Sequence, residues 1–388
     1  MPKAPNVFVV ATIVLIAIAM THIYVWLRLG PSLLGPPWWS RTLGWLMLAA
    51  GLSIPMSMVL WRAYKIPSAR FVLHQAHTWL GWLMLAALAL FTMDLLRWGV
   101  FGMLRGLNAD VSEARRLFFL RTGVGVAGVS TIVSGLYAMR LGSQDPKLEE
   151  VSVPMPGLSP TLDGFRIVQL SDIHVGPSIQ SDDVEAMCRI AMGAHPDLVV
   201  VTGDVVDGTP EQILEHVEKL GVLSAPHGVF LCTGNHEYYS DAFAWIPHFN
   251  RLGLRVLENE HVNIGGDDGF TLAGVYDHYS APFGHGPDVT RALHGRDPNK
   301  PVVLLCHQPR DIEKAARSGV NLQLSGHTHG GQIWPVGYLV KLVYGYVAGL
   351  YRISDRMHLY INRGTGFWGP GMRLPKPGEI TLIRLKAV

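Results

Sequence analysis

The sequence contains little cysteine, and acidic residues are scarce in its first 150 positions. Because only three cysteines occur among 388 residues, we expect no disulfide framework, and cysteine usage does not indicate a cellular compartment. Residues 1–150 contain 6 Asp or Glu against 13 Lys or Arg, whereas residues 151–388 contain 24 against 19. Binding to a nucleic-acid backbone requires clustered Lys and Arg. The mildly acidic C-terminal part is therefore not expected to have nucleic acid as its main partner.

Charged residues are also rare in four long apolar runs of the first 145 residues. A helix that crosses a bilayer needs about 20 predominantly apolar residues, and these runs approach or exceed that length. Trp38, Trp61 and Trp98 lie near their ends, where interfacial aromatic side chains are common. The third run contains Asp94 near one end. We predict a transmembrane anchor over residues 1–145, embedded in membrane lipid of the cell inner membrane, with helices at 7–27, 43–60, 73–96 and 117–139.

The orientation of this anchor depends on its basic residues. Lys and Arg are distributed almost equally between the two sides, so the positive-inside rule gives only a slight preference. The segment Arg115-Arg116-Leu117-Phe118-Phe119 directly precedes the fourth run. It resembles a twin-arginine export signal, which would make the following domain extracytoplasmic. The alternative interpretation is an ordinary basic loop beside a helix.

Three histidines of the anchor raise a second hypothesis for its role. His22, His74 and His77 lie in or near the apolar runs, and histidines that face inward in helical bundles can be axial ligands of haem. A haem-linked membrane redox protein is therefore an alternative function. Histidines at the ends of membrane spans are more often interfacial residues.

The residues after the anchor have the pattern of an α/β domain. Residues 146–162 are polar and proline-rich, which predicts a linker and an edge strand. From residue 163 to 388, apolar runs of strand length alternate with helical patterns, as in layered α/β domains. The predicted strands are 165–170, 198–201, 228–232, 301–306, 322–324, 359–361 and 379–385, and the predicted helices are 182–192, 211–220, 242–252 and 309–318.

Five short polar motifs follow apolar runs of this domain. In open α/β sheets, ligands collect outside the carboxyl ends of strands, so side chains that follow several strands converge. His, Asp and Asn supply nitrogen and oxygen ligands for metals, and these motifs contain enough of them for two adjacent ions. Paired ions are a common means of attacking phosphate esters. The motifs are Ser171-Asp172-Ile173-His174, Gly203-Asp204-Val205-Val206-Asp207, Gly234-Asn235-His236-Glu237, Cys306-His307 and Gly326-His327-Thr328-His329.

Together these motifs resemble the calcineurin-like metallophosphoesterase superfamily, and the N-terminal anchor resembles its bacterial membrane-bound branch. The resemblance extends from about residue 163 to 385 and implies a four-layer fold, in which a β-sandwich of two sheets is flanked by helices. It also implies that Asp172, His174 and His329 bind one metal ion, that Asp204 bridges two, and that Asn235, His307 and His327 bind the second. Such mixed N/O ligands suit two divalent ions of Mn, Fe or Zn.

The same resemblance implies roles for the remaining motif residues. His236 would protonate or stabilise the leaving oxygen, while a metal-held hydroxide attacks phosphorus in line. We expect Glu237 to orient His236 and Asp207 to hold its own loop in place. Arg310 and Arg363 could bind substrate oxygens, or each could form a surface salt bridge.

The expected substrate is a phosphodiester or phosphomonoester of a lipid or an envelope component, because the site is tethered to a membrane. A non-catalytic metal-binding scaffold on the same fold is the alternative. The apolar segment Trp334–Tyr351 follows the last motif closely and contains one charged residue, Lys341. It predicts either a core hairpin or an apolar lip that touches the bilayer. Its Pro and Gly residues argue against a fifth membrane span.

Overall fold

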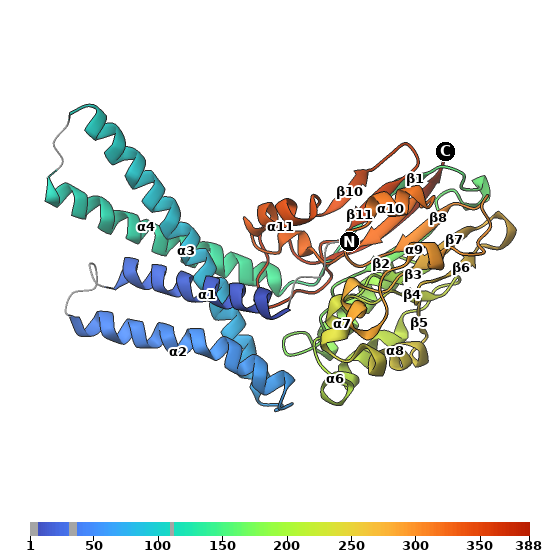
Figure 1. The fold of residues 1–388 in the computed structure, drawn as a ribbon, viewed down its shortest axis with the longest axis horizontal. Helices are drawn as coiled ribbons and strands as arrows, with labels where there is room; N and C mark the ends of the chain where they lie inside the picture. Colours follow the sequence, from blue (N-terminus) through green and yellow to red (C-terminus); the bar gives the residue numbers. More distant parts are fainter. Residues whose placement is uncertain (1–6, 31–36, 109–111) are drawn as a thin grey trace. The chain divides into compact units, whose positions relative to one another are not determined.

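The chain consists of an N-terminal helical unit and a C-terminal α/β unit (Figure 1). The computed structural model describes residues 7–30, 37–108 and 112–388. One compact unit comprises residues 1–140 with 369–372, and the other comprises residues 141–368 with 373–388.

The N-terminal unit contains four helices that are long and apolar enough to cross a membrane. The structure extends each helix beyond its uncharged run, because a charged residue at the end of an apolar run does not stop a helix. α3 is the clearest case, since it continues past Arg97 to a length of 38 residues. The helices are α1 (Val7–Leu29), α2 (Pro37–Arg62), α3 (Ala69–Gly106) and α4 (Glu113–Gly142).

Three polar contacts join α1 to α3. The buried Asp94 carboxylate accepts a hydrogen bond from the Tyr24 hydroxyl at 2.9 Å and forms an ion pair with Arg28 at 2.7 Å. Trp79 Nε1 donates to His22 Nε2, and His22 Nδ1 donates to the carbonyl of Ile18. Both ring nitrogens of His22 therefore have partners within the helices, so this arrangement does not favour His22 as a haem ligand.

The C-terminal unit contains two six-stranded sheets. In the first sheet both edge pairs run parallel and one inner pair is antiparallel, whereas in the second sheet the two edge pairs are antiparallel and the inner pairs are parallel. The first sheet has the order β1 (Lys147–Met155), β12 (Glu379–Ala387), β2 (Arg166–Leu170), β3 (Leu198–Val201), β4 (Val229–Leu231) and β5 (Leu254–Val256). The second has the order β10 (Gly349–Arg352), β11 (His358–Ile361), β9 (Leu322–Ser325), β8 (Val302–Leu305), β7 (Phe270–Gly274) and β6 (Glu260–Ile264).

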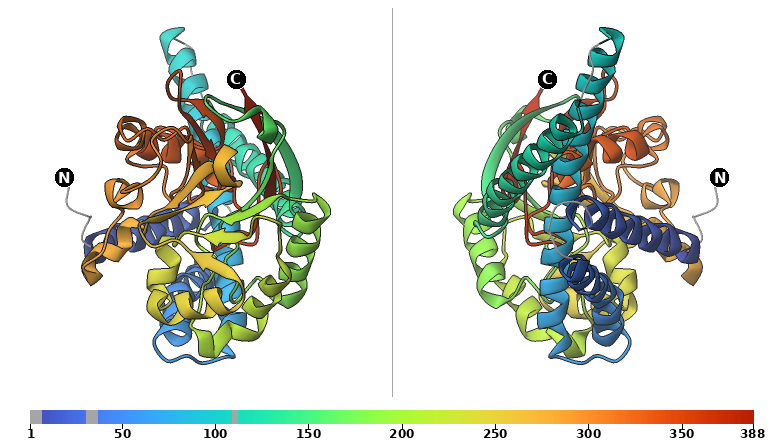
Figure 2. Two further views of the ribbon diagram at one scale, coloured as in Figure 1. Left: turned by 90° about the vertical axis from the view of Figure 1, so that its right-hand side faces the viewer. Right: turned by 90° about the vertical axis from the view of Figure 1, so that its left-hand side faces the viewer.

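The main hydrophobic core lies between these two sheets. Ile167, Leu198 and Phe230 of the first sheet belong to one buried cluster with Val303 and Leu322 of the second. Helices cover the outer faces, as two views of the fold show (Figure 2). The outer face of the first sheet is covered by α5 (Ser181–Gly193), α6 (Pro210–Val217) and α8 (Ala242–Arg251). The outer face of the second is covered by α9 (Val289–Ala292) and α10 (Ile312–Arg317). The predicted four-layer α/β sandwich is confirmed.

The carboxyl ends of the two parallel strand sets meet at one edge of the sandwich. Gln169 Nε2 at the end of β2 donates to the Ser325 carbonyl at the end of β9, at 3.0 Å. Just beyond the strands, the His327 amide donates to Asp172 Oδ1 at 2.9 Å. Loops from both sheets therefore share one small volume.

The segment Trp334–Tyr351 differs from the predicted core hairpin. Val336–Tyr344 forms the helix α11, which has no buried residue, and β10 pairs with β11 instead of with a hairpin partner inside this segment. The hairpin prediction was wrong because the apolar side chains of α11 point largely to the surface. The sequence also did not predict β5, β6 and β7, of which β5 is only three residues long.

We expect Gly326→Ala to disrupt the joint between the sheets. A Cβ at this position would lie 1.9 Å from Ser171 Oγ and 2.2 Å from Asp172 Oδ2. Because overpacking in a close-packed interior typically costs about 1–3 kcal/mol, the midpoint of thermal unfolding should fall. Gly193→Ala is the matched control, since its added Cβ has no neighbour within 4 Å. Equal unfolding midpoints for the two variants would contradict the proposed close approach.

Candidate metal centre

All seven predicted ligands lie within five residues of the carboxyl ends of parallel strands. Strands β2, β3 and β4 of the first sheet precede ligands on one side of the site, and β8 and β9 of the second precede those on the other. The segment after β4 also begins the short helix α7 (Asn235–Tyr239). The ligands are Asp172 and His174 after β2, Asp204 after β3, Asn235 after β4, His307 after β8, and His327 and His329 after β9.

Five of these seven residues have a left-handed backbone. Non-glycine residues with positive φ are uncommon, and they concentrate at functional sites, where the surrounding structure holds them in place. The strained conformation turns each side chain away from its strand and toward the shared edge. The residues are Asp172 (φ 51°), His174 (56°), Asp204 (52°), His327 (68°) and His329 (51°).

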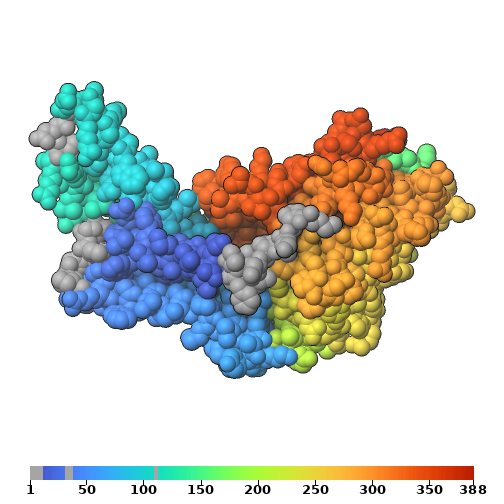
Figure 3. Space-filling view, in the orientation of Figure 1, coloured from blue at the N-terminus to red at the C-terminus, as the bar shows by residue number. Residues whose placement is uncertain are grey.

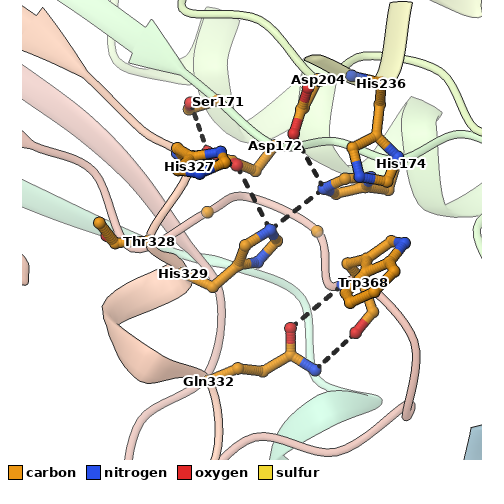
Figure 4. Close-up of polar contacts among 12 residues, drawn as sticks. Ser171, Asp172, His174, Asp204, His236, His327, Thr328, His329, Gln332 and Trp368 are labelled. Carbon is orange, nitrogen blue, oxygen red and sulfur yellow. Dashed lines mark hydrogen bonds and ion pairs between the residues drawn. The ribbon is translucent and has the colours of Figure 1, made fainter. Parts of the chain in front are cut away.

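The first group of donor atoms comes from Asp172, His174 and His329. The Nε2 atoms of the two imidazoles face each other at 3.1 Å, and His329 Nε2 lies 3.3 Å from Asp172 Oδ1. Figure 4 shows the His174 ring between Asp204 and the ring of His329. One carboxylate oxygen and two imidazole nitrogens therefore converge on one point.

The second group comes from Asp204, His307 and His327. His307 Nε2 lies 3.1 Å from Asp204 Oδ2 and 3.2 Å from His327 Nδ1. Asn235 is buried, and its Oδ1 atom has no hydrogen-bond partner among the described residues. Asp204 Oδ2 also lies 3.9 Å from His174 Nε2. The Asp204 carboxylate therefore lies within 4 Å of a donor atom of each group, and with His174 and His236 it forms a third candidate group.

For three of the four imidazoles, outer partners determine which nitrogen points inward. His174 Nδ1 donates to Asp207 Oδ2 at 3.2 Å, and His307 Nδ1 donates to the Thr202 carbonyl at 2.6 Å. His327 Nε2 shares a hydrogen bond of 2.7 Å with the Tyr344 hydroxyl. Hydrogen bonds of this kind orient histidine ligands and set their tautomer in metal sites. The remaining nitrogen of each ring faces the donor group.

The electrostatics of the site favour positive charge at two places. Burial would lower the pKa of His307, but the Asp204 carboxylate raises it well above the usual range. Burial and the neighbouring His307 lower the pKa of His327 to about 3. In the other pair, burial is outweighed by Asp207, which raises the pKa of His174 to about 8. Burial and His174 hold the pKa of His329 well below its usual range. The directions of these shifts favour a proton on one imidazole of each facing pair.

Both donor groups fit a divalent metal ion. Two nitrogens that each lie about 2.1 Å from one ion are separated by roughly 3.0–3.4 Å when the bond angle is about 90–109°. The two facing nitrogen pairs, at 3.1 and 3.2 Å, have this separation. The unpartnered Asn235 Oδ1 supplies a further neutral oxygen. No described cysteine belongs to either group, so the donors are nitrogen and oxygen only, as predicted.

Asp207 and Glu237 exchange the roles expected from the sequence. Asp207 Oδ1 contacts His236 Nδ1, and its other oxygen accepts from His174, so this carboxylate orients both rings. The Glu237 carboxylate instead accepts from the backbone amides of Asp204 at 3.0 Å, Val205 at 2.7 Å and Gly234 at 2.6 Å. Glu237 therefore holds the Asp204 loop, a role for which its longer side chain has the reach.

The two candidate substrate-binding arginines have different surroundings. Arg363 forms ion pairs with Glu379 at 2.7 Å and Glu149 at 3.0 Å, which corresponds to the salt-bridge alternative. Arg310 is exposed, and its guanidinium lies over the ring of Tyr344, 5.0 Å from the centroid. Since Tyr344 contacts His327, Arg310 is the arginine placed near the second donor group.

Three residues near the site were not found from the sequence. Tyr344 lies in a segment that appeared merely apolar. The buried Arg373 donates to the carbonyls of Arg363, Gly364 and Gly366, and it follows a loop with no recognisable motif. The ring of Trp368 lies 5.6 Å from that of His236, and its backbone is held by the side chain of Gln332 (Figure 4). Only the density of aromatic residues around position 340 was a usable signal.

The fold and this donor arrangement define a metal-dependent phosphoesterase domain, and comparisons with known proteins agree. The family model for calcineurin-like phosphoesterases matches residues 165–331. A Danio rerio protein described as a transmembrane protein with a metallophosphoesterase domain is 34% identical over 74% of this chain and 69% of its own length. An uncharacterized metallophosphoesterase of Helicobacter pylori is 37% identical over 69% of this chain and 70% of its own length.

A likeness to a solved structure is more distant. The 5'-nucleotidase precursor of Thermus thermophilus is 16% identical, with a TM-score of 0.31, over 57% of this chain and 54% of that chain. The identity and coverage of the two sequence relatives are sufficient for a family assignment. The chain belongs to the calcineurin-like phosphoesterase family.

We expect Tyr344→Phe to weaken metal binding without unfolding the protein. The change removes the hydroxyl that holds His327 Nε2, and loss of an outer partner of a metal ligand typically lowers affinity about 10- to 100-fold. Calorimetric titration of metal-free protein with Mn²⁺ or Zn²⁺ measures the effect. Tyr338→Phe, on the same helix but 69% exposed, is the control. If both variants bind metal as the native chain does, the Tyr344 contact has no role in orienting His327.

Proposed function

We propose that this chain is a membrane-anchored phosphoesterase that hydrolyses a phosphodiester or phosphomonoester with the help of two divalent metal ions. The observation that carries this proposal is the shared carboxylate of Asp204, which lies between the two donor groups. Paired metal sites in phosphoesterases place their ions about 3.5–4 Å apart. A carboxylate between two such ions offsets their mutual repulsion.

The ligand set supports catalysis rather than a scaffold role. Asp172, His174 and His329 would hold one ion, Asn235, His307 and His327 the other, and Asp204 both. Bound there, the ions would lower the pKa of a water molecule and offset the charge that develops on the phosphoryl oxygens. A scaffold that has lost catalysis would be expected to lack part of this set. All seven ligands are present and buried or half-buried.

His236 is proposed as the acid that protonates the leaving oxygen. Its backbone amide donates to Asp204 Oδ1 at 2.8 Å, which places the residue beside the shared carboxylate. Its Nδ1 atom contacts Asp207 Oδ1, so Nε2 is the ring nitrogen left to transfer a proton. The Asp207 carboxylate holds the ring in this orientation. Burial would raise the pKa of Asp207, but His236 and His174 hold it well below its usual range.

The proposed substrate is a phosphoester of a lipid or of an envelope component. Four helices of the chain are long and apolar enough to cross a membrane, and the Danio rerio relative is described as a transmembrane protein. An anchored site has the highest local concentration of substrates that share its membrane. The exposed Arg310 guanidinium is proposed to bind a substrate phosphoryl oxygen.

The catalytic domain is proposed to lie outside the cytoplasm of the cell, held at the inner membrane. Support comes from Arg115 and Arg116, which lie in the first turn of α4, directly before its apolar part. This is the position that paired arginines have in export signals.

Asp204→Asn tests the two-ion proposal. The neutral amide cannot balance two adjacent cations, so we expect the variant to retain at most one ion. Turnover of bis-p-nitrophenyl phosphate should fall by more than about 100-fold, since losing only an outer partner of a metal ligand costs roughly 10- to 100-fold. Elemental analysis and a panel that adds p-nitrophenyl phosphate and pyrophosphate-linked lipids give the readout. The exposed Asp267→Asn is the control. Full activity of Asp204→Asn would refute the assignment.

His236→Gln tests the acid role independently of metal content. Both ions should remain bound, while kcat falls by about 100- to 10,000-fold, the usual contribution of a general acid. The loss should be greater for an alkyl phosphoester than for a p-nitrophenyl ester, because nitrophenolate leaves without protonation. His294→Gln changes an exposed histidine and serves as the control. An equal loss for both leaving groups would contradict an acid role.

A C-terminal reporter fusion tests the proposed orientation. Alkaline phosphatase folds into an active enzyme only where disulfides form, so we expect an active fusion to the full chain. Replacing Arg115 and Arg116 with Lys should reduce the exported fraction if the pair acts as a signal. An inactive alkaline phosphatase fusion, together with a fluorescent cytoplasmic one, would place the domain in the cytoplasm.

A further inference from the structure

The outer face of α11 is apolar, unlike the outer face of an ordinary surface helix. Val336, Val340 and Tyr344 are spaced four residues apart and are half-buried, so they form the inner face. Surface helices normally place polar side chains opposite this face. Here Tyr338 is 69% exposed, Leu339 65%, Leu342 84% and Val343 69%. Among the described large apolar side chains, Leu342 is the most exposed. Figure 3 shows this orange-red segment at the molecular surface.

The helix segment that carries this apolar face contains basic residues and no acidic ones. No acidic residue occurs between Ile333 and Ile353, whereas Lys341 and Arg352 are present and exposed, and Arg352 forms an ion pair with Asp355 at 2.6 Å. The exposed Arg310 stacks on Tyr344 at the end of the same helix. An apolar helix face with basic neighbours is typical of helices that lie in the interface of an anionic bilayer. A surface that binds a soluble protein usually also presents polar side chains. The exposed residues of this face are Leu, Val and Tyr.

α11 is attached directly to the metal centre. The Tyr344 hydroxyl contacts His327 Nε2 at 2.7 Å, and Thr328 Oγ1 donates to the Val347 carbonyl just after the helix. Leu342 and Tyr344 are two residues apart, so the most exposed apolar side chain and a contact of a proposed metal ligand lie within one helical turn. The depth of α11 in a membrane would therefore set the depth of the site.

We propose that α11 is an interfacial helix that inserts Tyr338, Leu339, Leu342 and Val343 into an anionic bilayer surface. Such helices bury their apolar face about 5–10 Å into the boundary between headgroups and acyl chains. The phosphate groups of lipids lie at this level. The contact between Tyr344 and His327 would place the metal centre at a similar depth. This inference rests on the proposed phosphoesterase function and narrows its substrate class to phosphoesters at headgroup depth. The membrane-crossing helices of the same chain keep the domain near this surface.

Depth measurement by spin labelling tests the insertion without reference to activity. The three native cysteines are buried, so a nitroxide added to Leu342→Cys in the full chain reports that position alone. In vesicles of phosphatidylcholine and phosphatidylglycerol, the label should be accessible to oxygen and protected from a water-soluble nickel complex. A label at Val222→Cys should show the reverse. Val222 is a 62% exposed apolar residue at the end of the short 3-10 helix Glu218–Val222, which follows α6. A water-accessible label at position 342 would overturn the proposal, and so would spin–spin broadening from a second copy.

An activity comparison links the insertion to substrate choice. Leu339→Ser with Leu342→Ser should lower hydrolysis of a phospholipid in these vesicles by roughly tenfold, because two large apolar side chains no longer enter the bilayer. Hydrolysis of soluble bis-p-nitrophenyl phosphate should be unchanged, with Val222→Ser as the control. Equal losses on both substrates would overturn the role of α11 in substrate choice. If the native chain hydrolyses neither substrate while the label at position 342 lies in the bilayer, the proposed function fails and the insertion stands.

Discussion

The carboxylate of Asp204 is the group on which the arrangement of the site depends. It follows a buried strand of the first sheet, lies 3.1 Å from His307 of the second sheet, and belongs to two candidate donor groups, one with His174 and His236 and one with His307 and His327. Its position is held from behind by Glu237, which accepts hydrogen bonds from the Asp204 and Val205 amides. Burial would raise the pKa of Asp204, but the facing imidazoles of His307 and His236 hold it well below its usual range. A permanently charged carboxylate between two sets of donors is what a pair of cations requires.

The site also depends on the packing of the two sheets against each other. Neither sheet contains a complete set of donors, because Asp172, His174 and Asp204 follow the first sheet, whereas His307, His327 and His329 follow the second. The core between the sheets therefore positions the metal ligands as well as stabilising the fold. Left-handed backbone at five ligands is maintained only while both sheets hold the loops.

Much of the fold and of the ligand set could be predicted because both produce regular patterns in the sequence. The run Leu198–Val201 is wholly apolar, as expected of a strand buried on both faces, and the structure has a strand over those residues. The motif histidines and carboxylates follow such strands, so their convergence could be expected. Roles that depend on side-chain reach could not be predicted. Nothing local shows that Glu237 turns back to the backbone while Asp207 bridges His174 and His236.

The helix α11 shows why burial could not be predicted from an apolar sequence alone. An apolar run predicts burial, and a core hairpin was expected for the segment that contains it, yet Leu342 is 84% exposed. Pattern analysis assumes water as the surrounding solvent. In a chain with four helices able to cross a membrane, an apolar surface has a second possible partner. The same consideration applies to the exposed apolar side chains of those four helices, which need lipid around them rather than a protein core.

The separation of bound metal ions is the most direct test of the account. Anomalous diffraction from crystals of the full chain loaded with Mn²⁺ would locate each ion and its ligands. The account predicts two ions about 3.5–4 Å apart, one among Asp172, His174 and His329 and one among Asn235, His307 and His327, with Asp204 binding both. A single ion, or two ions that do not share Asp204, would contradict it.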